Sequence, residues 1–201
     1  MIRLLLVDDE HLIRTALAQI LDLEDDLMVV AQAGTAARGL ALARDVRPDV
    51  AVLDLQLPDE DGITLARRLA EAVPGCRSLI VTSHGRPGYL KRALAGGVSG
   101  FLPKTTSAAT LAEVVRTVHA GGRYVDPELA AEAIAAGDSP LTPREADVLD
   151  AAADGATVDD IAHRVHLSPG TVRNYLSSAA TKLGAANRHE AAAVARRMGW
   201  L

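Results

Sequence analysis

Two hydrophobic patterns divide the chain. Over the first 120 residues, short apolar runs typical of strands occur at residues 2–7, 28–31, 50–53, 79–81 and 101–102. A segment in which apolar residues recur at helical spacing follows each run, at residues 12–23, 36–44, 63–71, 89–95 and 111–120. This order predicts five strands that alternate with five helices.

The apolar runs are continuous, whereas the strands of a half-exposed sheet alternate apolar and polar residues. Continuous runs favour a parallel sheet that is covered on both faces, and right-handed crossovers then distribute the helices over both faces. We therefore expect a doubly wound α/β domain with a five-stranded parallel sheet at residues 1–120. In such sheets, functional side chains gather at the carboxyl ends of the strands.

From residue 141 onward, apolar positions recur at helical spacing alone. Four helices are expected, because the segment has four helix start signals, at Thr142, Thr157, Ser168 and Asn187. Only His166 and Leu167 separate the second helix from the third, and such a short turn is typical of a helix-turn-helix. The pattern predicts an all-α domain at residues 141–201 that presents its third helix to a DNA groove.

Residues 121–140 fit neither pattern. Glycine, proline, aspartate and serine occur at both ends of this segment, and an alanine-rich stretch near residues 127–136 lies between them. We interpret the segment as a linker with one short helix.

Composition supports two domains that are stabilised by packing. The 201 residues include a single cysteine, Cys76, which excludes an internal disulfide and a cysteine-based zinc site. No apolar run approaches the roughly 20 residues that cross a bilayer, so we expect a cytoplasmic protein. The formal net charge of −5 falls on residues 1–140, because residues 141–201 contain as many basic as acidic residues.

Several chemically active side chains are expected at the strand ends. Asp8 and Asp9 follow the first run, Asp54 the third and Thr82 ends the fourth, while Lys104 follows the fifth. Carboxylates that would repel each other indicate a site for magnesium, which prefers oxygen ligands. Asp54 could then act as a nucleophile for a phosphoryl group, with Lys104 and Thr82 binding its outer oxygens.

The first domain resembles the receiver domain of two-component response regulators. The motifs VDDE at residues 7–10, VLDLQLPDEDG at 52–62, VTS at 81–83 and GFLPK at 100–104 support the resemblance. It implies that Asp54 is the phosphoacceptor and that Asp8, Asp9, Asp54 and the Gln56 carbonyl bind magnesium. It also implies that Thr82, Phe101 and Lys104 form a phosphoryl-binding switch. For Phe101, the only phenylalanine in the chain, a simple core role is an open alternative.

The second domain resembles the LuxR-type DNA-binding domain of the NarL/FixJ family. The supporting motifs are LTPRE at residues 141–145, IAHRVHLSPGTVRNYL at 161–176 and KLGAANRHEA at 182–191. The expected DNA contacts are Thr171, Arg173, Asn174, Tyr175, Ser177, Lys182 and Arg188. Two residues depart from the family pattern: Tyr175 stands where histidine is common, and Ser177 replaces a frequent basic residue.

Together, the two resemblances imply a transcription regulator. A sensor histidine kinase is expected to phosphorylate Asp54, because no segment resembles an ATP-binding P-loop. Phosphorylation is expected to promote a homodimer that binds promoter DNA, so the chain is a switch rather than an enzyme.

Three alternatives remain at this point. A haloacid-dehalogenase-like phosphatase also uses an aspartate nucleophile with magnesium, but it usually needs a second acid two residues on, where this chain has Gln56. The receiver could instead be an atypical one that never takes phosphate and dimerises constitutively. The last domain could also be a helical bundle used for protein contacts.

Overall fold

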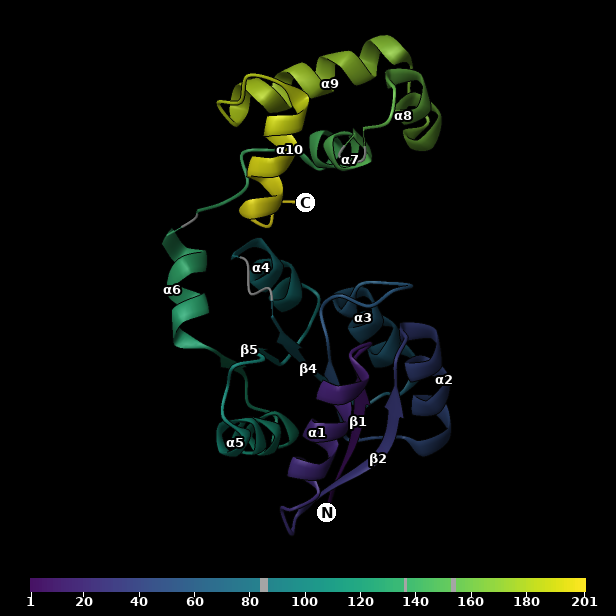
Figure 1. Cartoon of the computed structure of the whole chain (residues 1–201), viewed down its shortest axis with the longest axis vertical. Helices are drawn as coiled ribbons and strands as arrows, with labels where there is room; N and C mark the ends of the chain where they lie inside the picture. The colour runs from purple at the N-terminus through teal and green to yellow at the C-terminus, as the bar shows by residue number, and fades with distance from the viewer. Residues whose placement is uncertain (84–86, 136, 153–154) are drawn as a thin grey trace. The chain divides into compact units, whose positions relative to one another are not determined.

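The computed structural model describes residues 1–83, 87–135, 137–152 and 155–201 (Figure 1). The described part of the chain forms two compact units. The first, residues 1–83 and 90–130, contains a parallel sheet; the second, residues 87–89 and 131–201, is helical. Within the described residues, no helix is both long enough and apolar enough to cross a membrane.

The first unit is a parallel sheet with the strand order β2-β1-β3-β4-β5-β6. The strands are β1 (Ile2–Val7), β2 (Leu27–Ala33), β3 (Val50–Leu53), β4 (Arg77–Thr82), β5 (Gly100–Pro103) and β6 (Tyr124–Val125). The doubly wound α/β prediction is confirmed, because the order changes direction between β1 and β3 as such folds require.

The expected number of strands was wrong by one. The sixth strand, β6, lies in the segment interpreted as a linker and pairs Tyr124 with Gly100 of β5. The chain turns back after the preceding helix through Gly121, whose φ of 95° suits glycine, and Tyr124 then donates a 3.0 Å backbone hydrogen bond to Ser99. A two-residue strand is too short to produce a hydrophobic period, so the sequence pattern could not indicate it.

Helices cover both faces of the sheet (Figure 1). They are α1 (His11–Leu21), α2 (Ala36–Val46), α3 (Gly62–Ala72), α4 (Pro87–Ala95) and α5 (Ala108–His119). Leu4 and Leu6 of β1 pack in one core cluster with residues of α1 and α5. Val7, of opposite parity, contacts α2 at Gly39, where a Cβ would lie 2.8 Å from the Val7 side chain. The alternation along β1 thus separates two helical layers.

The second unit contains the four expected helices, and a fifth precedes them. They are α6 (Pro127–Ala135), α7 (Pro143–Ala152), α8 (Val158–Val165), α9 (Pro169–Lys182) and α10 (Arg188–Arg197). The short helix expected at residues 127–136 is α6, and Ala136 lies outside the described residues. A small core that is rich in alanine joins α7 to α10, with Val148, Ile161 and Val172 fully buried.

The turn between α8 and α9 has the features of a helix-turn-helix. Thr157 begins α8 with a capping box that includes Asp160. His166 ends it in the left-handed conformation (φ 53°), which histidine adopts more readily than most residues. Ser168 then caps α9 by accepting a hydrogen bond from the Thr171 backbone.

Candidate functional site

The carboxyl ends of β1, β3, β4 and β5 bring four of the expected residues to one edge of the sheet. Asp8 follows β1 and Asp54 follows β3, and a 2.7 Å hydrogen bond from the Asp54 backbone to Val7 keeps the two strands in register. Asp8, Asp54 and Thr82 are only 5%, 7% and 1% exposed. With Glu10 and Lys104, these three residues form what we call the rim site.

Lys104 is the centre of the rim site. Its Nζ lies 2.8 Å from Asp8 Oδ2, 2.8 Å from Glu10 Oε1 and 2.9 Å from Asp54 Oδ2. The Lys104 side chain is 8% exposed, so one ammonium with little access to water is shared among three carboxylates. The charges in this site do not balance without a further cation.

The pKa directions follow from this arrangement. Burial raises the pKa of Asp54 above its ordinary value, and the hydrogen bond from Lys104 offsets only part of that rise. For Lys104, burial alone would lower the pKa, but the hydrogen bonds to Asp8, Glu10 and Asp54 outweigh it and raise the pKa. Lys104 therefore stays charged, while Asp54 is an aspartate whose negative charge is incompletely stabilised.

The carboxylates of Asp8, Glu10 and Asp54 could hold a cation. One oxygen of each lies within 4.8 Å of the others. Asp9, expected as a ligand, is exposed and is not a member of this group. At Gln56, the backbone N–H makes a long, 3.4 Å hydrogen bond to Asp54 Oδ1. Sequence reasoning did not assign Glu10 a role, although it is the third of three successive acids at the end of β1.

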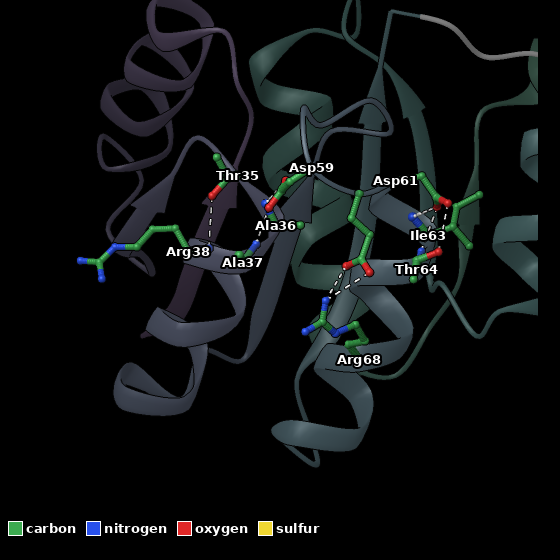
Figure 2. Close-up of polar contacts among 10 residues, drawn as sticks. Thr35, Ala36, Ala37, Arg38, Asp59, Asp61, Ile63, Thr64 and Arg68 are labelled. Atoms are coloured by element: carbon green, nitrogen blue, oxygen red, sulfur yellow. Dashed lines mark hydrogen bonds and ion pairs between the residues drawn. The ribbon is translucent and has the colours of Figure 1, made fainter. Parts of the chain in front are cut away.

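The loop that follows Asp54 is tied to two helices through its acids (Figure 2). Asp59 accepts 2.9 Å hydrogen bonds from the backbones of Ala36 and Ala37, and so caps α2 from a different loop. These bonds lower the pKa of Asp59. Asp61, the residue directly before α3, caps that helix by accepting hydrogen bonds from the backbone N–H groups of Ile63 and Thr64.

Glycine is required where this loop packs behind Asp54. A Cβ on Gly62 would lie 2.0 Å from the Asp54 carbonyl oxygen, which is closer than any side chain allows. The Gly62 backbone donates a 2.8 Å hydrogen bond to the Leu55 carbonyl. The backbone of Asp54 is thus supported directly by the first turn of α3.

Two further residues border the rim site. Phe101 of β5 is completely buried, which suits a core role and leaves its expected switch role as a prediction. Arg14 of α1, which sequence reasoning missed, donates a hydrogen bond from Nη1 to the Asp8 carbonyl. No pattern could have indicated Arg14, because its contact is to the backbone.

The expected DNA-binding residues are divided over the surface of α9. Val172, Leu176 and Ala179 are buried, and Arg173, Asn174 and Ser177 are exposed on other faces of the helix. Thr171 and Tyr175 are half-buried; Thr171 bonds the Ser168 hydroxyl at 2.8 Å, and Tyr175 packs against the core. Arg188, also half-buried, begins α10.

Lys182, the remaining candidate, differs from the others. Its Nζ lies 2.7 Å from Oε2 of Glu145, which is only 4% exposed. The Lys182 side chain is itself 35% exposed, but its charge is already paired with this buried carboxylate.

Known protein families match both halves of the chain. The family model of the response regulator receiver domain matches residues 4–116, and that of bacterial regulatory proteins of the luxR family matches residues 139–195. YvfU, an uncharacterized transcriptional regulatory protein of Bacillus subtilis, is 39% identical over 203 residues, with 100% of each chain covered.

Two further relatives cover the chain from end to end. DevR/DosR, a DNA-binding transcriptional activator of Mycobacterium tuberculosis, is 37% identical over 207 residues, which cover 98% of this chain and 95% of the relative. The crystal structure of ChrA, a response regulator in a heme-sensing two-component system, is similar with a TM-score of 0.60 and 32% identity, and the similarity covers 100% of this chain and 98% of ChrA.

Proposed function

This chain belongs to the LuxR-family transcriptional response regulators, and on that premise we propose that phosphorylation of Asp54 by a sensor histidine kinase switches its binding to promoter DNA. The observation that carries the proposal is the rim site, in which a buried aspartate at a strand end faces a buried lysine. Asp54 could not be retained there at low cost for stability alone, because an incompletely paired buried charge destabilises a fold.

The chemistry of the transfer follows from the groups present. An Oδ atom of Asp54 attacks the phosphorus, the bond between phosphorus and the donor's histidine nitrogen breaks, and an acyl phosphate forms. Lys104 would then exchange part of its carboxylate contacts for phosphoryl oxygens, which keeps its charge paired. The Thr82 hydroxyl, buried at the end of β4, is the group that would follow the phosphoryl oxygens and move the adjacent loop.

The donor set of the rim site fits magnesium. Asp8, Glu10 and Asp54 would hold the ion, because one carboxylate oxygen of each lies within 4.8 Å of the others. Asp9 and the Gln56 carbonyl, which the family resemblance assigns to the ion, remain predictions. When bound, the ion supplies positive charge that the three carboxylates lack and that a phosphoryl group needs. Gln56, where a phosphatase of the alternative class needs an acid, favours a long-lived acyl phosphate over turnover.

A second copy of the chain is the proposed partner of the phosphorylated form. Leu12 and Ile20 lie on one face of α1, and Leu23 lies just beyond its end; they are 81%, 39% and 81% exposed. Apolar side chains grouped in this way lose contact with water when two chains associate. Pairing would also bring two α9 helices to one DNA duplex, which a domain with no net charge needs for affinity.

Labelling with a small phosphodonor tests the proposal. Acetyl phosphate with magnesium should produce one phosphoryl adduct per chain, detected by mass spectrometry, and Asp54→Asn should remove it. Asp25→Asn, which alters an exposed carboxylate outside the rim site, is the matched control and should be labelled like the wild type. An adduct that persists in Asp54→Asn would overturn the assignment.

A further inference from the structure

A buried acid of α7 in the second unit joins this helix to α9 through hydrogen bonds. Glu145, in the first turn of α7, is 4% exposed. Its Oε2 accepts hydrogen bonds from Lys182 Nζ at 2.7 Å, from the Thr142 backbone at 2.6 Å and from the Thr142 hydroxyl at 2.9 Å. Its Oε1 accepts from the Ser178 hydroxyl at 2.6 Å. We call Glu145 with Thr142, Ser178 and Lys182 the Glu145 anchor.

The carboxylate in this anchor is fully satisfied. Hydrogen bonds from Lys182, Ser178 and Thr142 lower the pKa of Glu145 to about 2. The group therefore stays ionised at neutral pH, and both of its oxygens have partners. If Lys182 turned outward to a DNA phosphate, this charge would lose its cation inside the protein, which costs more than an exposed phosphate contact returns.

The anchor acts on the helix that faces DNA. Ser178 and Lys182 are four residues apart on α9, so they lie on one face and approach Glu145 together. In this half of α9 the fully buried residue is Ala179, with Ala180 and Leu183 partly buried against the core, whereas the first half buries Val172 and Leu176. The hydrogen bonds from Ser178 and Lys182 to Glu145 add to these apolar contacts and join the second half of α9 to α7.

We propose that Glu145 is a positioning residue for DNA recognition, which sets the position of α9 through Ser178 and Lys182, and that the Lys182 charge serves this anchor and not a DNA phosphate. The inference replaces the expectation that Lys182 contacts DNA directly. It rests on the DNA-binding function of the domain, and it is independent of the phosphorylation of Asp54.

A second acid–base pair on α7 provides matched controls. Arg144 and Asp147 form an ion pair at 3.8 Å, and their side chains are 63% and 59% exposed. Such a pair contributes little to stability, because water screens both charges. Asp147→Asn and Arg144→Met therefore make the same chemical changes as Glu145→Gln and Lys182→Met, in the same domain, without touching the anchor.

The test measures DNA affinity against salt concentration with the full chain. The probe is the duplex that the wild-type chain selects from a random-sequence DNA pool, at a temperature where Trp200 fluorescence shows each variant to be folded. Glu145→Gln and Lys182→Met should each weaken binding by roughly tenfold at every salt concentration, with an unchanged salt slope. The double variant should lose no more than either single variant, because both changes break one anchor.

Three outcomes would overturn the proposal. A salt slope flattened by about one unit in Lys182→Met, with normal affinity in Glu145→Gln, would make Lys182 a phosphate contact. Affinities equal to those of Asp147→Asn and Arg144→Met would leave the anchor with a structural role only. If either charge variant does not fold, Ser178→Ala replaces it: as an uncharged change, it should weaken binding by roughly threefold without altering the slope, and normal affinity would contradict the proposal.

Discussion

Each unit of this chain contains a lysine bonded to a buried carboxylate, but the two sites differ in how many donors serve each acid. In the rim site, one ammonium, Lys104, is shared by Asp8, Glu10 and Asp54. In the Glu145 anchor, a single carboxylate accepts four hydrogen bonds, of which one comes from Lys182.

The pKa directions express this difference. Burial raises the pKa of Asp54 in spite of its lysine, whereas hydrogen bonds lower the pKa of Glu145 to about 2. An under-compensated acid can gain a cation or a phosphoryl group, because either improves its electrostatic balance. A saturated acid has nothing to gain. A buried ion pair therefore indicates chemistry only where hydrogen-bond donors to the acid are scarce.

The largest expected effect separates the two lysines. Lys104→Met should slow labelling of Asp54 by acetyl phosphate by at least ~100-fold, because it removes a preorganised charge from the phosphoryl oxygens. Lys182→Met, the matched change in the anchor, should be labelled at the wild-type rate. The rates can be followed by mass spectrometry on chains whose folding is checked by circular dichroism. Equal rates in the two variants would remove the distinction between the sites.

The next largest effect is the loss of the Glu145 contribution to stability at low pH. Because the folded pKa of Glu145 is about 2 and the ordinary value is 4.5, its contribution to stability is complete above pH 4.5 and is lost as the pH falls toward 2. Glu145→Gln should therefore destabilise the helical unit by about 2 kcal/mol at neutral pH, and by progressively less in acid.

Trp200, the only tryptophan, packs against the helical core, so its fluorescence reports this unit within the full chain. Denaturant titrations from pH 7 to pH 2.5 should show the wild-type and Glu145→Gln curves converging. A stability difference that stays constant over this range would show that the carboxylate charge is not what stabilises the anchor.

Magnesium should stabilise the sheet unit, which contains the rim site, without stabilising the helical unit. An ion that binds the rim site adds about 1.4 kcal/mol to folding at ten times its dissociation constant, by mass action. Circular dichroism should show this gain for the sheet unit, while Trp200 fluorescence should show none for the helical unit. Asp8→Asn should abolish the gain, and Asp147→Asn should preserve it. A gain seen by both probes would locate the ion elsewhere.

Most of the fold could be predicted from the sequence, because most of its strands and helices are long enough to show a hydrophobic pattern or a helix start signal. Continuous apolar runs and helix start signals such as Thr157 and Ser168 were sufficient to order the main elements. The sequence did not indicate β6, because a strand of two residues, Tyr124 and Val125, is too short to show a hydrophobic period. Its strand depends on the return of the chain after α5, which is a tertiary event.

The candidate site was predicted as far as strand ends determine it. Asp8, Asp54, Thr82 and Lys104 follow parallel strands, so topology alone brought them together. Side-chain direction was beyond the pattern: Glu10 and Asp9 are both exposed, but only Glu10 reaches Lys104 and joins the rim site. The pairing of Lys182 with Glu145 was missed for the same reason, because it spans 37 residues between two helices.

The smallest expected effect tests whether the loop behind Asp54 is positioned from outside the rim site. Asp59 is not bonded to Lys104; it caps α2 by two 2.9 Å hydrogen bonds and so fixes the loop that carries Asp54 (Figure 2). Asp59→Ala should slow the labelling of Asp54 by roughly threefold, since a displaced carboxylate meets the phosphodonor less often in a reactive geometry.

Glu60→Ala is the matched control for this loop. It breaks the 2.9 Å ion pair with Arg68; the Arg68 and Glu60 side chains are 46% and 23% exposed. The change should leave the rate unchanged, because a pair that water reaches holds a loop weakly. Both variants keep every group of the rim site, so a difference between them can only reflect the position of the loop. If Asp59→Ala is labelled as fast as Glu60→Ala, the packing of Gly62 against the Asp54 carbonyl is sufficient to hold the nucleophile, and the cap serves α2 alone.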